Sequence, residues 1–287
     1  MSQQLRFGVI GWPLSHTLSP IFQQAALDAM GLDATYIAAA TSPDVIEMRL
    51  QEAREGNWRG LNVTVPHKIR VAELVDELTP SAKRMGAVNT IDVAGCKLLG
   101  DNTDAGGFAR ALTQYGGFDP SGVRAVILGA GGAARAVAWA LRDLGASHLT
   151  VANRHPARAE TVATAVDGES LATSACGLSG PELRRAISRA TLLVNTTSVG
   201  MAGGPAPAEL PVPSSWLKQQ LFVCDIVYQP AETPMLRRAR NIGCRTQGGL
   251  EMLVLQGAAS LERWTERPAP LPTMMNAARS ALSAPTA

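Results

Sequence analysis

The sequence predicts an α/β protein with two domains, and three observations support this prediction. The chain has 287 residues, and its 46% apolar fraction is enough for two buried cores. Short apolar runs rich in β-branched residues alternate with helix-like segments, a pattern typical of parallel α/β layers. A glycine-rich turn in the middle of the chain joins one of these runs to an alanine-rich helix.

Eight apolar runs are candidates for buried strands. Because helix-like segments separate them, we expect mostly parallel sheets with helices on their faces. The runs lie at residues 7–10, 35–39, 61–65, 88–93, 125–128, 149–152, 192–196 and 222–226.

Two Gly/Pro-rich joints, at residues 115–122 and 246–249, flank a middle block that resembles an inserted domain. The helical periodicity of residues 248–264 would return the chain to the first domain and close a cleft between the two. Small ligands usually bind in such clefts. We therefore expect one domain of residues 1–104 and 248–287 and a second of residues 105–247.

Composition argues against several classes of function. With 26 Lys and Arg against 24 Asp and Glu, the chain lacks the basic surface that nucleic acids or membranes require. The polar residues 1–7 and the absence of an apolar stretch of 18 residues favour a cytoplasmic protein. No C-x-x-C pair occurs, so we expect no metal site and interpret the cysteines as buried free thiols. The cysteines are Cys96, Cys176, Cys224 and Cys244.

The glycine-rich turn predicts a dinucleotide site. Residues 125–128 run straight into the turn, where Gly129 permits a tight bend and Gly131 lets a pyrophosphate approach the backbone. Ala134 is small enough for close packing of the helix, whose N-terminus favours phosphate. This order of elements favours a nucleotide site over a merely structural turn. The turn is completed by Ala130, Gly132 and Ala133.

The end of the following strand indicates which nucleotide binds. NAD enzymes place an acid about 20 residues beyond the glycines, but here the sequence is Asn153, Arg154 and His155. Arg154, and Arg158 one turn later, would pair with a 2′-phosphate through charge-assisted hydrogen bonds. The alternative is that both arginines are solvated surface charges. We favour NADP over NAD.

The NTTSVGM segment at residues 195–201 follows another apolar run, at the sheet edge where a nicotinamide would lie. Its small polar residues suit a flat ring and ribose, although an ordinary polar loop has the same appearance. The candidate contacts are Thr196, Ser198, Val199 and Gly200.

Lys68 and Asp104 are candidates for the reacting centre. Lys68 follows a strand pattern that ends at Pro66, where a surface lysine at a helix start is the alternative. Asp104 lies in the segment GDNTDAGGF and could merely cap a helix running to residue 115. An enzyme that reduces a ketone by hydride needs a proton donor at the nascent alkoxide, and a lysine paired with a carboxylate supplies one.

Two hydroxyls near the N-terminus, Thr17 and Ser19, precede a helix that we expect to start near Pro20. Hydroxyls beside a helix N-terminus make a candidate receptor for a carboxylate, or a simple capping turn.

Eight motifs, in order along nearly the whole chain, resemble those of the shikimate dehydrogenase family. They are HTLSP at 16–20, NVTVPHK at 62–68, GAVNT at 86–90, DNTDAGGF at 101–108, GAGGAARA at 129–136, NTTSVGM at 195–201, DIVYQP at 225–230 and GGLEMLVLQGA at 248–258.

The resemblance implies reduction of 3-dehydroshikimate to shikimate by NADPH, on the route to chorismate and the aromatic amino acids. It implies a substrate-binding first domain, an NADP-binding inserted domain and an active site in the cleft between them. Motif by motif, it implies that Lys68 and Asp104 are catalytic. The implied substrate contacts are Thr17, Ser19, Thr64, Asn89, Tyr228 and Gln256, and those near the nicotinamide are Ile226, Gly249 and Met252.

The chain departs from the family pattern at three places. Thr17 stands where serine is usual, so that a methyl group lies beside the expected carboxylate site. His155 replaces a common threonine, which bears on 2′-phosphate affinity, and a protonated histidine would strengthen it. Gln23 and Gln24 replace a His-Asn pair, and we expect this change to affect helix packing more than chemistry.

Several alternatives stay open at this point. They are an NAD-linked quinate/shikimate dehydrogenase, an enzyme for an amino-substituted analogue, and a non-catalytic nucleotide-binding homologue. Retention of both Lys68 and Asp104 weighs against the last of these. For the oligomeric state, a homodimer is one hypothesis.

Overall fold

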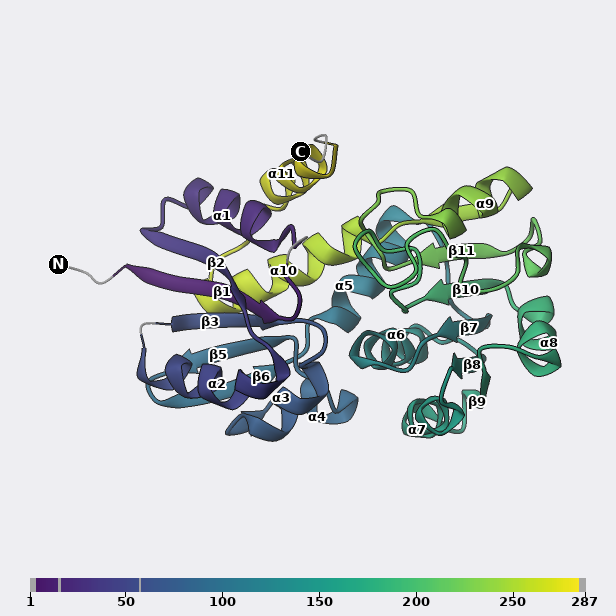
Figure 1. Cartoon of the computed structure of the whole chain (residues 1–287), viewed down its shortest axis with the longest axis horizontal. Helices are drawn as coiled ribbons and strands as arrows, with labels where there is room; N and C mark the ends of the chain where they lie inside the picture. The colour runs from purple at the N-terminus through teal and green to yellow at the C-terminus, as the bar shows by residue number, and fades with distance from the viewer. Residues whose placement is uncertain (1–3, 15–16, 57, 284–287) are drawn as a thin grey trace. The chain divides into compact units, whose positions relative to one another are not determined.

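A computed structural model describes residues 4–14, 17–56 and 58–283 (Figure 1). The chain forms two compact units, the first of Met1–Gly107 with Val254–Ala287 and the second of Phe108–Leu253. The divisions fall inside helices α5 (Asp104–Arg110) and α10 (Leu250–Thr265), whereas the sequence suggested residues 104 and 248. A helix that continues through a division offers no turn residues by which a sequence could mark it.

The first unit contains a six-stranded mixed sheet in the order β2-β1-β3-β5-β6-β4. β1 pairs in parallel with β2 and β3, and β4 with β6, while β5 runs antiparallel to β3 and β6. The strands are β1 (Leu5–Gly11), β2 (Ala34–Ala40), β3 (Trp58–Val63), β4 (Glu77–Leu78), β5 (Thr90–Ala94) and β6 (Lys97–Asp101).

Helices cover both faces of this sheet. Apolar side chains of α2 (Ile46–Glu55), α3 (Lys68–Leu74) and α4 (Pro80–Met85) share one buried cluster with residues of β1, β3 and β5. On the other face, Trp264 of α10 stacks on Phe7 of β1 with ring centroids 5.3 Å apart. An added Cβ at Gly60 would lie 2.3 Å from the Trp264 ring, so this close packing requires glycine. α1 (Ser19–Ala29) packs beside α11 (Leu271–Ser283).

The second unit contains an entirely parallel sheet in the order β12-β11-β10-β7-β8-β9. Counted from β7, this is the strand order 3-2-1-4-5-6 of a dinucleotide-binding Rossmann fold, whose order reverses between β7 and β10. The strands are β7 (Arg124–Leu128), β8 (His148–Asn153), β9 (Ala172–Gly177), β10 (Leu192–Asn195), β11 (Phe222–Asp225) and β12 (Arg245–Gln247).

The helices of this unit wind on both faces of the sheet. α8 (Pro181–Arg189) and α9 (Pro234–Ile242) pack into one apolar cluster with alternate residues of β7, β10 and β11. α6 (Gly132–Asp143) and α7 (Pro156–Val166) contact each other, and right-handed crossovers put them on the opposite face. The predicted α/β class with two sheets is therefore confirmed.

Two expectations need correction. The thiol of Cys96, in the turn between β5 and β6, is exposed, and Cys176 is only partly buried; Cys224 and Cys244 are buried as expected, and all four thiols are free. Asp104 does not cap a helix that runs unbroken to residue 115. It is the first residue of α5, and a π-helical turn at Ala111–Tyr115 follows.

Among residues 4–14, 17–56 and 58–283, no helix is both long and apolar enough to cross a membrane. The same residues contain no group of three or more His, Cys, Asp or Glu side chains arranged to hold a metal ion.

Candidate functional site

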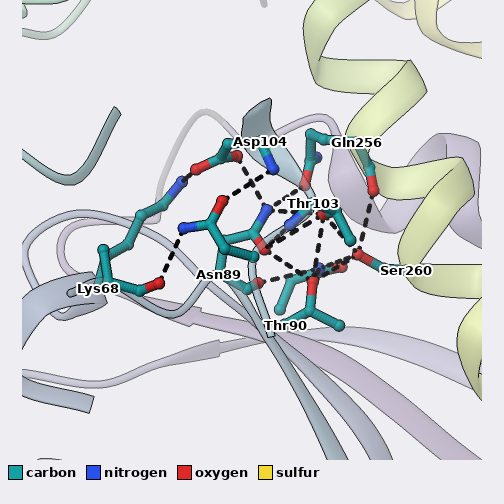
Figure 2. A network of polar contacts seen from close by, with 10 residues as sticks. Lys68, Asn89, Thr90, Thr103, Asp104, Gln256 and Ser260 are labelled. Carbon is teal, nitrogen blue, oxygen red and sulfur yellow. Dashed lines mark hydrogen bonds and ion pairs between the residues drawn. The ribbon is translucent and has the colours of Figure 1, made fainter. Parts of the chain in front are cut away.

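Lys68 and Asp104 form a mostly buried ion pair in the first unit. Lys68 begins α3, just beyond β3, and Asp104 begins α5, just beyond β6. The Lys68 Nζ donates to Asp104 Oδ2 at 2.6 Å, with side-chain exposures of 15% and 3%. Figure 2 shows the two side chains pointing toward each other. Two polar groups 36 residues apart in the chain therefore meet where a proton can be held or transferred.

The Asp104 carboxylate is not used to cap its own helix, so it is available to Lys68. Asn102 Oδ1 accepts from the Asp104 amide at 3.1 Å, and the Asn102 side chain is anchored in turn on the Ala87 carbonyl at 2.9 Å. Asn102, rather than Asp104, therefore supplies the side-chain oxygen at this helix start. Lys68 is fixed similarly, since its carbonyl accepts from the Val88 amide at 2.8 Å.

Asn89 connects the ion pair to the rest of the site. Its Nδ2 donates to Asp104 Oδ1 at 2.9 Å and to Gln256 Oε1 at 3.0 Å. Asn89 immediately precedes β5, Asp104 begins α5 and Gln256 lies on α10. The buried Asn89 side-chain amide therefore joins the sheet to both α5 and α10. Four of the predicted residues, Lys68, Asn89, Asp104 and Gln256, thus share one network (Figure 2).

Three buried residues that the sequence did not single out extend this network. Ser260 Oγ lies 2.7 Å from Thr90 Oγ1 and accepts from Asn62 Nδ2 at 2.9 Å. Asn62 on β3, Thr90 on β5 and Ser260 on α10 are at most 6% exposed. A polar position inside an otherwise apolar strand is the available sequence signal for Asn62, but nothing local marks Ser260.

The remaining predicted substrate contacts of this unit are placed separately. Thr17 Oγ1 accepts from the Ser19 amide at 3.3 Å, at the start of α1. Thr64 follows β3 and is half-buried, and an added Cβ at Gly11 would lie 2.3 Å from its methyl group. His16, the first residue of the HTLSP motif, lies outside the described residues.

The glycine turn of the second unit has the shape of a phosphate cradle. Gly129 has φ of +109°, and an added Cβ there would lie 2.5 Å from Thr196 Oγ1, so only glycine fits. At Gly131, directly before α6, an added Cβ would meet nothing within 4 Å. Open space in front of a helix N-terminus is what a pyrophosphate requires. Gly132 and Ala133 form the first turn of α6, and Ala130 precedes them, partly exposed.

The candidate 2′-phosphate residues follow β8. Asn153 Nδ2 donates to the His155 carbonyl at 3.1 Å and shapes the turn into α7. Arg154, His155 and Arg158 are all exposed. Two guanidinium groups beside a histidine provide the charge that a 2′-phosphate would need.

The loop after β10 is held by its own side chains. Thr196 Oγ1 donates to the Leu128 carbonyl at 2.7 Å, which ties the loop to the residue before Gly129. Asn195 Oδ1 accepts from the Thr197 amide and hydroxyl, while its Nδ2 donates to the Val199 carbonyl at 3.2 Å. Ser198 is exposed, and Gly200 is buried with φ of +88°.

Asp225 anchors this loop to the segment after β11. Its Oδ1 accepts from Asn195 Nδ2 at 2.9 Å and the Val227 amide at 3.1 Å, and its Oδ2 accepts from the Thr233 hydroxyl at 2.7 Å. Burial raises the pKa of the Asp225 carboxyl to about 6, because the three hydrogen bonds from neutral donors lower the pKa by less than desolvation raises it. Asp225 was not among the predicted site residues. The available sequence signal is its position as a charged residue at the end of an apolar strand.

Gly249 and its neighbours complete the predicted set. An added Cβ at Gly249 would lie 2.0 Å from the Ile226 carbonyl oxygen, so glycine is required where this segment crosses the loop after β11. Ile226 and Tyr228 on that loop are half-buried, and Met252 on α10 is 7% exposed.

Three family models match the chain. Residues 9–91 match the substrate-binding domain of shikimate dehydrogenase, residues 111–200 match shikimate/quinate 5-dehydrogenase, and residues 249–279 match the C-terminal domain of shikimate 5′-dehydrogenase.

Individual relatives extend over nearly the whole chain. The shikimate dehydrogenase (NADP(+)) of Moorella thermoacetica is 44% identical over 277 residues, covering 96% of this chain and 93% of the relative. The structure of shikimate 5-dehydrogenase from Thermus thermophilus in complex with NADP(H) and shikimate is 39% identical, with a TM-score of 0.85, and covers 97% of this chain and all of that one. The 5-ketofructose reductase of Gluconobacter sp. strain CHM43 is 33% identical, with a TM-score of 0.82 and coverage of 98% and 99%.

Proposed function

This chain belongs to the shikimate dehydrogenase family, and we propose that its Lys68 and Asp104 act on the reacting oxygen. Its activity is the NADP-linked, reversible reduction of 3-dehydroshikimate to shikimate, which implies a place in chorismate and aromatic amino acid biosynthesis. The observation that carries the proposed roles is the buried Lys68–Asp104 contact of 2.6 Å.

The pair suits the proton-transfer half of this reaction. NADPH, when bound, supplies the hydride that reaches the carbonyl carbon. The Lys68 ammonium would donate a proton to the oxygen that becomes the shikimate hydroxyl, and would take it back in the reverse direction. The Asp104 carboxylate holds that ammonium in place from a buried position, so Lys68 does not have to be ordered during the reaction.

The other substrate contacts are proposed by motif and supported by their polar chemistry. Asn89 and Gln256 belong to the same hydrogen-bond network as the pair. Thr17 and Ser19 offer hydroxyls for the carboxylate, and Thr64 and Tyr228 offer hydroxyls for the ring.

For the nucleotide, the open space at Gly131 and the tight approach at Gly129 support a pyrophosphate cradle formed by residues 129–133. Asn153, Arg154, His155 and Arg158 are proposed for the 2′-phosphate. The proposed nicotinamide contacts are Thr196, Ser198, Val199, Gly200, Ile226, Gly249 and Met252.

A specificity comparison tests this assignment. We expect the highest kcat/KM with shikimate and NADP, and lower values when quinate replaces shikimate or NAD replaces NADP. 5-Ketofructose belongs in the reductive assay, because a structural relative is named for its reduction. Higher kcat/KM with quinate and NAD would favour the alternative of a quinate/shikimate dehydrogenase. No turnover of shikimate, quinate or an amino-substituted analogue would favour a non-catalytic nucleotide-binding homologue.

Domain roles, location and assembly are part of the same proposal. We assign substrate binding to residues 1–104 and 248–287 and nucleotide binding to residues 105–247. Four free thiols and a net charge of +2 support a cytoplasmic enzyme without a nucleic-acid or membrane partner. A homodimer stays a prediction, which sedimentation velocity would test.

A further inference from the structure

A continuous chain of side-chain hydrogen bonds leads to Asp104 through the interior of the first unit (Figure 2 shows its second half). Each link is 2.7–2.9 Å long, and none of its residues except the last belongs to the ion pair itself. In order, the links join Tyr36, Asn62, Ser260, Thr90, Asn89 and Asp104.

A backbone carbonyl fixes the direction of the chain at its far end. The Asn89 carbonyl oxygen can only accept, and it accepts from Asn62 Nδ2 at 3.2 Å. The Asn62 amide oxygen therefore faces Tyr36, whose hydroxyl donates to it at 2.8 Å. Because burial raises the pKa of Tyr36 well above its ordinary value, the phenol keeps the proton that this bond needs.

A backbone N–H fixes the direction at the near end. The Thr103 amide can only donate, and it donates to Asn89 Oδ1 at 2.8 Å. Asn89 Nδ2 must therefore face Asp104 Oδ1 and Gln256 Oε1. If the Asn89 amide were flipped, its oxygen would lie against a carboxylate oxygen and another amide oxygen.

The two hydroxyls between these ends each have one proton to give. The Thr90 hydroxyl lies 2.9 Å from Asn89 Oδ1, to which it can donate, and 2.7 Å from Ser260 Oγ, a contact in which either hydroxyl can be the donor. Ser260 accepts from Asn62 Nδ2, and its own proton also faces the Gln256 carbonyl oxygen at 3.1 Å. The links at both ends are thus fixed in direction, and the two hydroxyls between them complete the chain to Asp104.

We propose that Asn62, Thr90 and Ser260 are positioning residues, which together with the Thr103 amide hold the Asn89 side chain in the orientation that donates to Asp104 and Gln256. This inference rests on the proposed function, since it matters only if Asp104 and Lys68 act on the reacting oxygen. Removing one hydrogen bond of the chain lets the Asn89 side chain rotate more freely. While it is rotated away, the Asp104 carboxylate lacks the hydrogen bond from Asn89 Nδ2.

The decisive variant is Thr90→Val, which has nearly the shape of threonine but lacks the hydroxyl. We expect kcat for shikimate oxidation to fall by about tenfold or more, because one buried hydrogen bond and the orientation that depends on it are lost. The NADP dissociation constant, measured without shikimate, should change less than about twofold. Thr90→Ser keeps the hydroxyl and should restore most of the turnover.

Thr150→Val is a matched control. Thr150 is also a buried strand threonine whose hydroxyl pairs with a serine, Ser174, at 2.9 Å, but it lies on β8 of the second unit. The Thr150→Val variant should lose about as much stability in urea unfolding as Thr90→Val, but its kcat should be unchanged. If Thr90→Val also keeps its kcat, the network only stabilises the fold and the inference is wrong.

Two further measurements separate the possible failures. If Thr90→Val does not fold, Ser260→Ala takes its place with the same expectation, and failure of both variants to fold while Thr150→Val folds would mean a purely structural role. Lys68→Ala in the same assay tests the proposed function by itself. Full turnover in that variant would contradict the roles of the pair, whereas loss there with normal kcat in Thr90→Val would overturn the inference alone.

Discussion

The two units each bury an aspartate near the carboxyl end of a strand, and the two carboxylates are satisfied in different ways. Asp104 receives the Lys68 ammonium on one oxygen and the Asn89 amide on the other. Asp225 receives an amide side chain, a backbone amide and a hydroxyl, all neutral. Neutral donors satisfy hydrogen-bonding capacity, but they do not offset the desolvation of a charge, so burial raises the pKa of Asp225 to about 6.

This difference suggests different uses for the two groups. A carboxylate beside a partly accessible cation can orient a proton donor. Asp225 is fully buried among neutral donors, so its carboxylate can only hold segments of the chain together. These segments are the end of β10, the loop after β11 and Thr233, the N-cap of α9. The charge of Asp225 therefore costs stability near neutral pH, whereas the charge of Asp104 is matched by Lys68.

Lys68→Ala should produce the largest effect, because it removes the cation and leaves Asp104 with neutral donors only, as Asp225 has. We expect turnover to fall by about 10²- to 10⁴-fold, the usual contribution of a positioned acid–base group. The NADP dissociation constant should stay nearly unchanged. Steady-state kinetics with shikimate, combined with fluorescence titration of the nucleotide, measures both.

The same variant should also lose about 3 to 5 kcal/mol of unfolding free energy, since one partner of a buried pair is left unpaired. The double variant Lys68→Ala/Asp104→Asn removes that buried charge, so it should regain stability in urea without regaining turnover. Equal weakening of NADP binding in the single variant would count against a role at the reacting oxygen.

Asp225→Asn should make the stability of the protein less dependent on pH. The folded pKa of about 6 exceeds the ordinary value of 3.8, so the folded state holds this proton more tightly than the unfolded chain. The stabilisation that protonation gives is complete below pH 3.8 and is lost as the pH rises through 6, a change of about 3 kcal/mol.

Asparagine fits the same site, because its oxygen can accept from Asn195 and Val227 while its NH2 group donates to Thr233. The stability of Asp225→Asn relative to the unmodified chain should therefore increase between pH 4.5 and 7.5, as measured by urea unfolding. Taking this difference cancels the other titrating groups, and the adjacent Cys224 stays neutral because burial raises the pKa of its thiol. A difference that does not change with pH would show that Asp225 titrates normally.

Arg154→Ala should affect only nucleotide binding by the second unit. Its effect in free energy should be smaller than those of Lys68→Ala and Asp225→Asn. Arg154 is exposed, so the lower end of the range for hydrogen bonds to charged groups applies, about 1.5 kcal/mol. NADP affinity should fall by about tenfold, with NAD affinity and the KM for shikimate unchanged. Equal weakening of both nucleotides would show that the arginine is structural.

Local patterns were sufficient for much of this molecule. The glycine turn at 129–133 was recognisable because strand, turn and helix are adjacent in the chain, and most of the core strands are continuous apolar runs. Among the strands without a signal, β9 and β12 lie at sheet edges, where exposure permits polar residues.

Contacts between distant segments were harder to predict. Asp104 has the local context of a helix cap, and only its contact with Lys68 distinguishes the two roles. Asn62 and Ser260 are 198 residues apart in the chain, and neither has a neighbouring residue that reveals the pairing. Asp225 ends an apolar strand, but its three donors come from three segments, so its anchoring role depends on the tertiary structure.

Thr17→Ser should produce the smallest change, and it tests the substrate side of the first unit without touching the ion pair. Both residues keep the hydroxyl that accepts from the Ser19 amide, so the turn before α1 should be preserved. The difference is one methyl group, which is worth at most about 1 to 3 kcal/mol of discrimination and less at a half-exposed position. We expect the KM for shikimate to change by less than about tenfold with kcat unchanged, because the methyl group acts on binding and not on the reacting oxygen. A large loss of kcat would mean instead that Thr17 is coupled to the Lys68–Asp104 pair. The separate assignment of Thr17 to carboxylate binding and of Lys68 to proton transfer would then be wrong.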